Sequence, residues 1–186
     1  LFALFALLLV VFLLTGSANS QLSVTVTNNT NTTPNLAASY ASFAAALADL
    51  NSVTAMTGPV TLTLQAGSET SPIKGFVLGS ASLNPVLSAT NTITINTSGS
   101  VTINANVGTS NGPSAVPDGM LILNGADYVT IDGITFTDGN SASALVAMEF
   151  GIALFKRAAS DGCNNNTIQN CTLNMQRVNN ATGSGP

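Results

Sequence analysis

An internal repeat in the second half of the chain constrains its fold more than any other feature. Residues 119–124 and 128–136 match residues 151–156 and 165–173, at an offset of 32 residues in the first part and 37 in the second. The difference of five fits a loop insertion at 158–164. This alignment places Ile131 over Ile168 and Ile134 over Cys171. A match of this kind is typical of architectures in which each turn of chain stacks on the one before it.

Short segments that alternate between Thr and an aliphatic residue surround this repeat. They occupy residues 60–64, 93–95, 101–103, 129–131, 134–136, 167–168 and 171–173. Alternation with period two predicts strands that each bury one face. Gly133 and Asn170 fall at equivalent corners, and both residue types tolerate a left-handed backbone. We therefore expect an all-β protein built as a parallel β-solenoid. A β-sandwich is the alternative, but it does not predict two segments that match corner for corner.

One helix is predicted ahead of the strands. Ser39 is its expected N-cap, and Tyr40, Phe43, Ala44, Leu47 and Leu50 recur on one face of a 3.6-residue period. Residues 51–52 end the pattern. The opposite face carries almost no charge, so we expect this helix to lie against the strands.

The first 14 residues are an uncharged apolar run, followed by small residues that include Ala18 and Ser20. This pattern predicts a signal peptide over residues 1–20, cleaved before Gln21. A membrane anchor is the alternative, but it requires ~20 apolar residues. We expect residues 21–38 to form a polar linker or strand, and residues 39–186 to form the cap and first turns of the solenoid. The absence of an initiator Met, and the end at 183–186 without a closing element, indicate a fragment of a longer product.

The segment 123–136 resembles the rung signature of right-handed parallel β-helix proteins, above all the large secreted ones of Bacteroidetes-type bacteria. Residues 165–173 look like the next rung. Residues 42–51 and 58–64 are similar to the N-terminal entry of those proteins, a capping helix followed by a first strand. The resemblance implies a right-handed parallel β-helix whose open end is plugged by the helix. Some members of this group cleave acidic polysaccharides, and others are adhesins or surface scaffolds.

The composition excludes several classes of function. Charged residues make up 6% of the chain, and its four basic residues cannot form the cationic face that nucleic acid or anionic lipid requires. The chain has no His, which removes Ser-His-Asp and Cys-His nucleophiles and His-ligated metal sites. No phosphate-binding Gly-rich loop is present. We therefore expect no metal and no cofactor. Cys163 and Cys171 allow either a disulfide or a buried free thiol at Cys171.

Carboxylates remain as candidates for acid and base chemistry. The candidates in the second half are Asp118, Asp127, Asp132, Asp138, Glu149 and Asp161. Asp132 is the best placed, at a corner between two strands, but its counterpart in the next repeat is Gln169. Asp before Gly is above all a turn signal, which favours a structural role for it.

Other polar residues also have two interpretations. Lys156 and Arg157 are the only clustered basic pair, and such a pair more often solvates a turn than neutralises a substrate. Tyr128 could contact sugar or pack a corner, and its aliphatic neighbours favour packing. Asn165, Asn166 and Asn170 are predicted to form hydrogen-bonded ladders between turns.

Three functions stay open. The favoured one is a secreted or cell-surface scaffold or adhesin without a catalytic site in these residues. The second is a polysaccharide lyase or glycoside hydrolase whose groove lies beyond Pro186, and the third is a non-catalytic carbohydrate-binding module. The expected partners are a polysaccharide or surface glycan and further rungs of the same chain. We expect no nucleic acid partner and no stable membrane insertion after cleavage. Residues 21–186 alone should associate through an open C-terminal edge.

Overall fold

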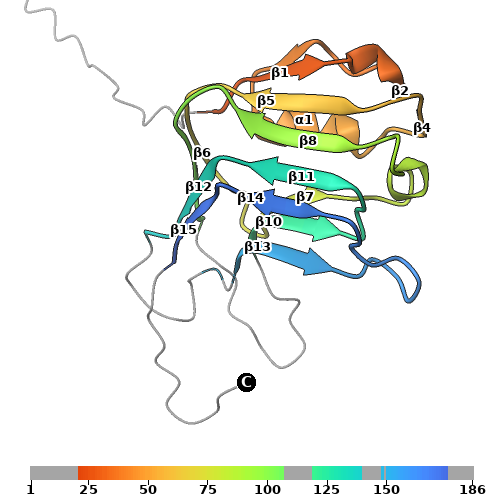
Figure 1. Ribbon diagram of the computed structural model, residues 1–186. Coiled ribbons are helices and arrows are strands. Elements are labelled where there is room, and N and C mark those ends of the chain that lie inside the picture. Colours follow the sequence, from red (N-terminus) through yellow and green to blue (C-terminus); the bar gives the residue numbers. More distant parts are fainter. Residues whose placement is uncertain (1–20, 107–118, 140–147, 149, 176–186) are drawn as a thin grey trace, which may run out of the picture.

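The computed structural model describes residues 21–106, 119–139, 148 and 150–175, and these residues are mostly in β-strands (Figure 1). The strands before and in the first part of the stack are β1 (Val24–Thr27), β2 (Thr32–Thr33), β3 (Ser39–Tyr40), β4 (Ala55–Met56), β5 (Val60–Leu64), β6 (Gly67–Thr70) and β7 (Phe76–Leu78). The later strands are β8 (Ile93–Thr97), β9 (Val101–Asn104), β10 (Gly119–Asn124), β11 (Val129–Asp132), β12 (Ile134–Thr137), β13 (Phe150–Phe155), β14 (Thr167–Gln169) and β15 (Thr172–Asn174). The described residues hold one α-helix, α1 (Phe43–Leu50), and two short 3-10 helices, Asn29–Asn31 and Asn84–Val86.

The strands form a six-stranded sheet in the order β14-β11-β8-β5-β1-β3, a four-stranded sheet in the order β15-β12-β9-β6, and a three-stranded sheet in the order β13-β10-β7. A two-stranded sheet joins β2 and β4. From β5 onward the chain visits the six-, four- and three-stranded sheets in turn and then returns to the first. We call each such passage a circuit. Every strand from β8 to β15 pairs in parallel with the strand one circuit earlier.

The paired registers place aliphatic residues over one another. In the six-stranded sheet Leu62, Ile95, Ile131 and Ile168 are successive Cα partners. The first three are fully buried. In the four-stranded sheet Ile103, Phe136 and Leu173 align in the same way. Burying one such side chain contributes roughly 1.5–3 kcal/mol relative to leaving it exposed, so these ladders account for much of the core.

Most predicted strands, and the offset of 37 residues, are confirmed, because Ile131 pairs with Ile168 and Phe136 with Leu173. The offset of 32 in the first part of the repeat is wrong. Gly119 stands opposite Phe150, one residue before the predicted partner Gly151. This register sets Leu121 beside Ile152 and Leu123 beside Leu154. The match of the two glycines was therefore misleading. A shift of one residue moves every side chain of a strand to the other face of the sheet, so a single glycine pair does not fix the register.

The corners between strands use left-handed backbone, as the repeat predicts. Gly133 has φ +80° and Asn170, at the equivalent corner, has φ +52°. The corner before the six-stranded sheet also uses left-handed backbone, with Tyr128 at φ +56° and Asn165 at φ +55°. Asn is among the few residues with a side chain that adopt this region readily, which explains its abundance at these positions.

The predicted start of the helix is wrong. Helix α1 begins at Phe43, and its N-cap is Ser42, whose hydroxyl accepts a hydrogen bond of 3.1 Å from the Ala45 N–H. Ser39 and Tyr40 are instead extended and pair antiparallel with β1. The buried face consists of Phe43, Ala46, Leu47 and Leu50, while the predicted core residue Ala44 is exposed. The helix is shorter than predicted because the extended pairing with β1 occupies its first expected turn.

The N-terminal segment and α1 cover one end of the stack. Strand β1 runs antiparallel to β5, so the six-stranded sheet is mixed, and Leu22 and Val24 are buried beneath it. At the three-stranded sheet, the Asn51 side chain after α1 donates to the Val77 carbonyl and accepts from the Gly79 N–H. In Figure 1, β1 lies at one end of the stack, and β14 and β13 lie at the other.

The predicted signal peptide, residues 1–20, lies outside the described residues. Within the part of the chain that the structure describes, no helix has the length and apolar character needed to cross a membrane.

Candidate functional site

Asp132, the best catalytic candidate in the sequence, is held by the next circuit. Its two carboxylate oxygens accept hydrogen bonds of 2.8 Å from the Asn170 side chain and 2.9 Å from the Gln169 side chain. These bonds, the one from Asn170 first, hold the pKa of Asp132 below its ordinary value. Gln169 is the Cα partner of Asp132, so the acidic residue does not recur along the stack. The arrangement joins two circuits and gives the carboxylate a structural role.

Asp161 is part of a polar network at another corner. It forms an ion pair with Arg157, and both of its oxygens accept from the Asn84 side chain. Asn84 also donates to the Asn124 carbonyl and accepts from the Ser80 N–H. The network spans three consecutive circuits, which indicates that it fixes the corner. Lys156, beside Arg157, is exposed.

The other predicted carboxylates do not complete a catalytic pair. Asp127 accepts from the backbone and side-chain nitrogens of Asn164. Asp138 is buried, and its backbone N–H donates to the Asn174 carbonyl. Asp118 and Glu149 lie outside the described residues. No group of three or more acidic or Cys side chains that could hold a metal ion occurs among the described residues.

The predicted asparagine ladders take a different form. The Asn166 side chain donates to the Ala126 carbonyl and accepts from the Val129 N–H of the preceding circuit. Asn170 bonds to Asp132, as described above. Both residues therefore link circuits, but their partners are backbone groups and a carboxylate rather than other asparagines. Tyr128 is half-buried at its left-handed corner.

Both cysteines are free thiols, and both are half-buried against the core. The Cys163 thiol contacts the Leu123 carbonyl, and burial raises its pKa. Cys171 follows the corner at Asn170, in the position of Ile134. A disulfide between them is therefore absent, and Cys171 is less buried than predicted.

Glu69 is a side chain of the candidate site that sequence reasoning missed. It occupies the core ladder position of Ile103 and Phe136, one and two circuits later, and only 6% of its surface is exposed. One oxygen accepts hydrogen bonds from the N–H of Leu22 (2.9 Å) and of Phe43 (2.8 Å). The other accepts from the Ala44 N–H at 3.3 Å. The carboxylate thus binds the positive N-terminal end of α1.

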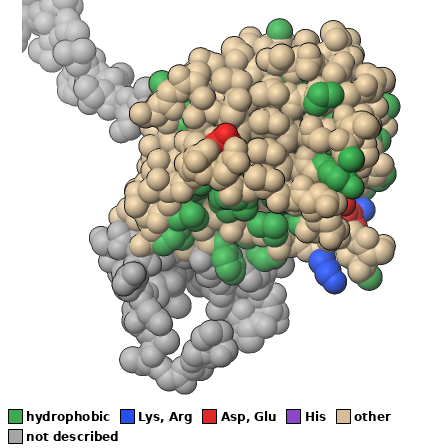
Figure 2. All heavy atoms as spheres, in the orientation of Figure 1, with side chains coloured by type: hydrophobic (Ala, Val, Ile, Leu, Met, Phe, Trp, Pro, Cys, Tyr) green, Lys and Arg blue, Asp and Glu red, His purple; other side chains and the backbone are tan. Residues whose placement is uncertain are grey.

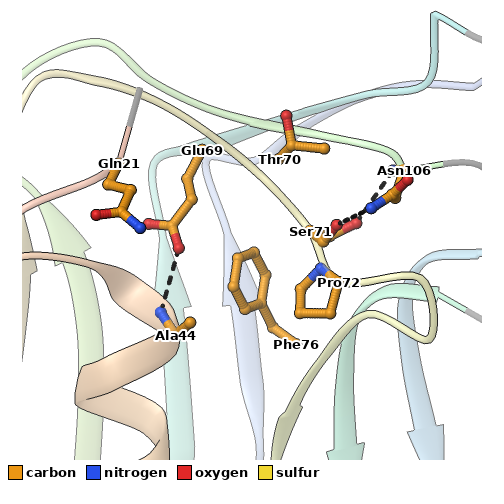
Figure 3. A pocket seen from close by; sticks show the side chains of 8 residues that line it. All are labelled: Gln21, Ala44, Glu69, Thr70, Ser71, Pro72, Phe76 and Asn106. Carbon is orange, nitrogen blue, oxygen red and sulfur yellow. Dashed lines mark hydrogen bonds between the residues drawn. The ribbon is translucent and has the colours of Figure 1, made fainter. Parts of the chain in front are cut away.

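A pocket of about 430 Å³ opens beside this carboxylate (Figure 3). It is lined by Gln21, Ala44, Glu69, Thr70, Ser71, Pro72, Phe76 and Asn106. Asn106 donates to the Ser71 carbonyl at 3.0 Å and closes one wall. The pocket therefore lies where the N-terminal segment, α1 and the first circuit meet.

The outer face of the six-stranded sheet carries columns of threonine. Thr27, Thr61, Thr94, Thr130 and Thr167 are successive Cα partners across five strands. Each is exposed or partly exposed. Figure 2 shows this face, and most of its side chains are neither hydrophobic nor charged. The face is thus hydrated by hydroxyl and amide groups.

Comparison of the chain with protein-family models, with curated proteins and with solved structures gives no match.

Proposed function

We propose that the chain forms the capped N-terminal end of a right-handed parallel β-helix and serves as a non-catalytic scaffold that is secreted or displayed on the outer cell surface. In this proposal each circuit is one rung of the helix. The repeated visiting order of the three sheets supports it, as do the parallel pairing of each strand with its counterpart and the resemblance of residues 123–136 to a β-helix rung. The apolar start and small residues at 1–20 support export.

The observation that carries the scaffold proposal is the asymmetry between the two ends of the stack. At one end the N-terminal segment and α1 cover the core. At the other end Ile168 and Leu173 are 42% and 50% exposed, although their partners Ile131 and Phe136 are fully buried. The ladder residues Ile168 and Leu173 of the last described rung therefore present apolar surface of the kind on which a further pair of such strands could stack.

The hydrogen-bond partners of the carboxylates support a non-catalytic role. General acid–base cleavage of a polysaccharide needs two carboxylates, or a carboxylate and a basic group, that converge on one groove. Asp127, Asp132 and Asp161 are instead each bound to polar groups of a neighbouring segment. Their positions are explained by holding corners together.

The proposal is tested by locating the protein in its own cells and assaying it there. Intact cells are treated with a protease, and the medium and the shaved peptides are analysed by mass spectrometry. We expect peptides from residues 21–175 in the medium or the shaved fraction. Their release only after lysis would contradict surface display or secretion. The purified chain is also incubated with acidic and neutral polysaccharides, and formation of new reducing ends or unsaturated products would contradict the non-catalytic assignment.

A further inference from the structure

Glu69 is a buried carboxylate, and none of the described residues forms an ion pair with it. In the part of the chain that the structure describes, the one ion pair is Arg157–Asp161, at a corner of the later circuits. Lys74, the nearest basic residue in sequence, is exposed. Backbone N–H groups and the helix dipole offset part of the cost of burying the charge, but a buried carboxylate is ordinarily paired with a full positive charge. A positive charge beside Glu69 would offset more of this cost.

Gln21, the residue that follows the predicted cleavage site, lines the same pocket as this carboxylate. The Leu22 N–H donates to Glu69 Oε2 at 2.9 Å. Three covalent bonds, with a summed length of about 4.3 Å, join that nitrogen to the backbone nitrogen of Gln21. The backbone nitrogen of Gln21 is therefore within about 7 Å of the carboxylate, by the same bond lengths. Gln21 and Glu69 line one pocket, and Figure 3 shows their side chains next to each other.

We propose that cleavage between Ser20 and Gln21 releases an α-ammonium group that enters this pocket and pairs with Glu69, completing the N-terminal cap. Hydrolysis adds water across the Ser20–Gln21 peptide bond, leaving a carboxylate on Ser20 and an amine on Gln21 that takes up a proton. While the leader is attached, the same nitrogen is an uncharged amide. Processing therefore supplies the missing cation, and the inference rests on the proposed export of the chain.

The pairing gives processing a structural consequence. Glu69 contacts Leu22 on the N-terminal segment and Phe43 on α1, so it connects both parts of the cap to β6. A positive charge in the pocket stabilises the ionised carboxylate that makes these contacts. Removal of the leader then stabilises the cap after export, when the chain folds outside the cytoplasm.

The test is a double-mutant cycle on the N-terminus and Glu69. One protein begins at Gln21, released from a fusion that leaves no extra residue, and the second keeps Ser17 to Ser20 in front of it. Each is made with Glu69 and with Glu69→Gln, and unfolding by urea is measured at pH 6, where a free α-amino group is protonated. With Glu69 present, we expect the extended protein to be the less stable of the two. Its unfolding equilibrium constant should exceed that of the protein that begins at Gln21 by a factor on the order of ten, because only the latter places an opposite charge at short range from Glu69.

In the Glu69→Gln pair this difference should vanish. A difference of equal size in both pairs, or none in either, would overturn the proposal. If Glu69→Gln does not fold, acetylation of the α-amino group of the protein that begins at Gln21 replaces it. Acetylation removes the charge and keeps Glu69. The proposal requires it to abolish the greater stability of the protein that begins at Gln21 over the extended protein.

The chemical state of Gln21 is checked by mass. Attack of the amine on its own side-chain amide would expel ammonia and leave an uncharged lactam, and a Gln21→Ala protein cannot react in this way. Loss of ammonia from the exported protein would overturn the pairing in vivo. An exported protein that begins elsewhere would contradict the cleavage site, and the absence of an exported form would contradict the proposed function. The cycle on the purified proteins measures the pairing independently of both.

Discussion

Ile131 and Ile168 are Cα partners in the parallel pair β11–β14, but Ile131 is fully buried and 42% of Ile168 is exposed. The two residues have the same identity and occupy the same place in the repeat. They differ because, among the described strands, Ile131 has a neighbouring strand on each side, whereas Ile168 has one on one side only. The last described circuit therefore ends in an apolar edge. This edge carries neither proline nor a charged residue within β14 or β15, which are common protections against edge-to-edge association.

Charges placed on this edge should reduce self-association of residues 21–186. We expect Ile168→Lys together with Leu173→Lys to shift the protein from oligomer toward monomer, measured by size-exclusion chromatography with light scattering. Ile73→Lys is the matched control, because Ile73 is 55% exposed but lies in the first circuit. If the parent protein is already monomeric, or if Ile73→Lys reduces association equally, the exposed strand edge does not drive self-association.

A side chain at Gly133 should destabilise the fold. Gly133 has φ +80°, and a Cβ built there would lie 2.8 Å from Thr97 Oγ1. We expect Gly133→Ala to cost about 1–2 kcal/mol of unfolding free energy, since L-residues are disfavoured in left-handed backbone. Gly139→Ala is the control, because a Cβ at Gly139 meets no atom within 4 Å. Chemical denaturation of the two variants compares them, and equal stabilities would contradict the corner geometry.

Two serines distinguish the predicted start of α1 from the observed one. Ser42 caps the helix through the Ala45 N–H, whereas Ser39 is exposed on β3. Ser42→Ala should lower the unfolding free energy by about 1 kcal/mol, the usual cost of losing an N-cap. Ser39→Ala should change it by less than about 0.5 kcal/mol, as surface substitutions usually do. The reverse order would restore the helix start predicted from periodicity.

The Asp132 carboxyl group should make the stability of the fold depend on pH. Hydrogen bonds from Asn170 and Gln169 hold its folded pKa below the ordinary value. A lowered folded pKa contributes stability that is fully present above the unfolded pKa of about 3.9 and is lost as the pH falls through the folded pKa. Titration of the Asp132 carboxyl carbon by NMR measures the folded value. Asn170→Gly preserves the left-handed corner but removes the strongest donor, so it should raise that pKa. An unchanged pKa would show that the hydrogen bond has no effect.

The strands and corners were predictable because they repeat. Ile131 and Gly133 recur as Ile168 and Asn170. The hydrophobic pattern and the need for left-handed backbone at the corner therefore predicted the same strands and the same corner. Glu69 was not predictable in the same way. Residues 67–70 contain no aliphatic residue, and the strand is recognised by its partner β9, whose Ile103 shows the core position that Glu69 occupies. The partners of Glu69 are backbone groups distant in the sequence, which periodicity does not reveal.

The stacking of circuits is tested most directly by a distance across the six-stranded sheet. Thr27 and Thr167 lie at the same register on β1 and β14, with β5, β8 and β11 between them. Nitroxide labels at these two positions, with both native cysteines replaced, allow a pulsed electron-spin measurement. Stacked circuits predict a single narrow distance distribution near 19 Å, since neighbouring strands are about 4.8 Å apart and only the label arms widen the distribution. A broad distribution, or one centred much beyond that distance, would contradict the stacked parallel circuits.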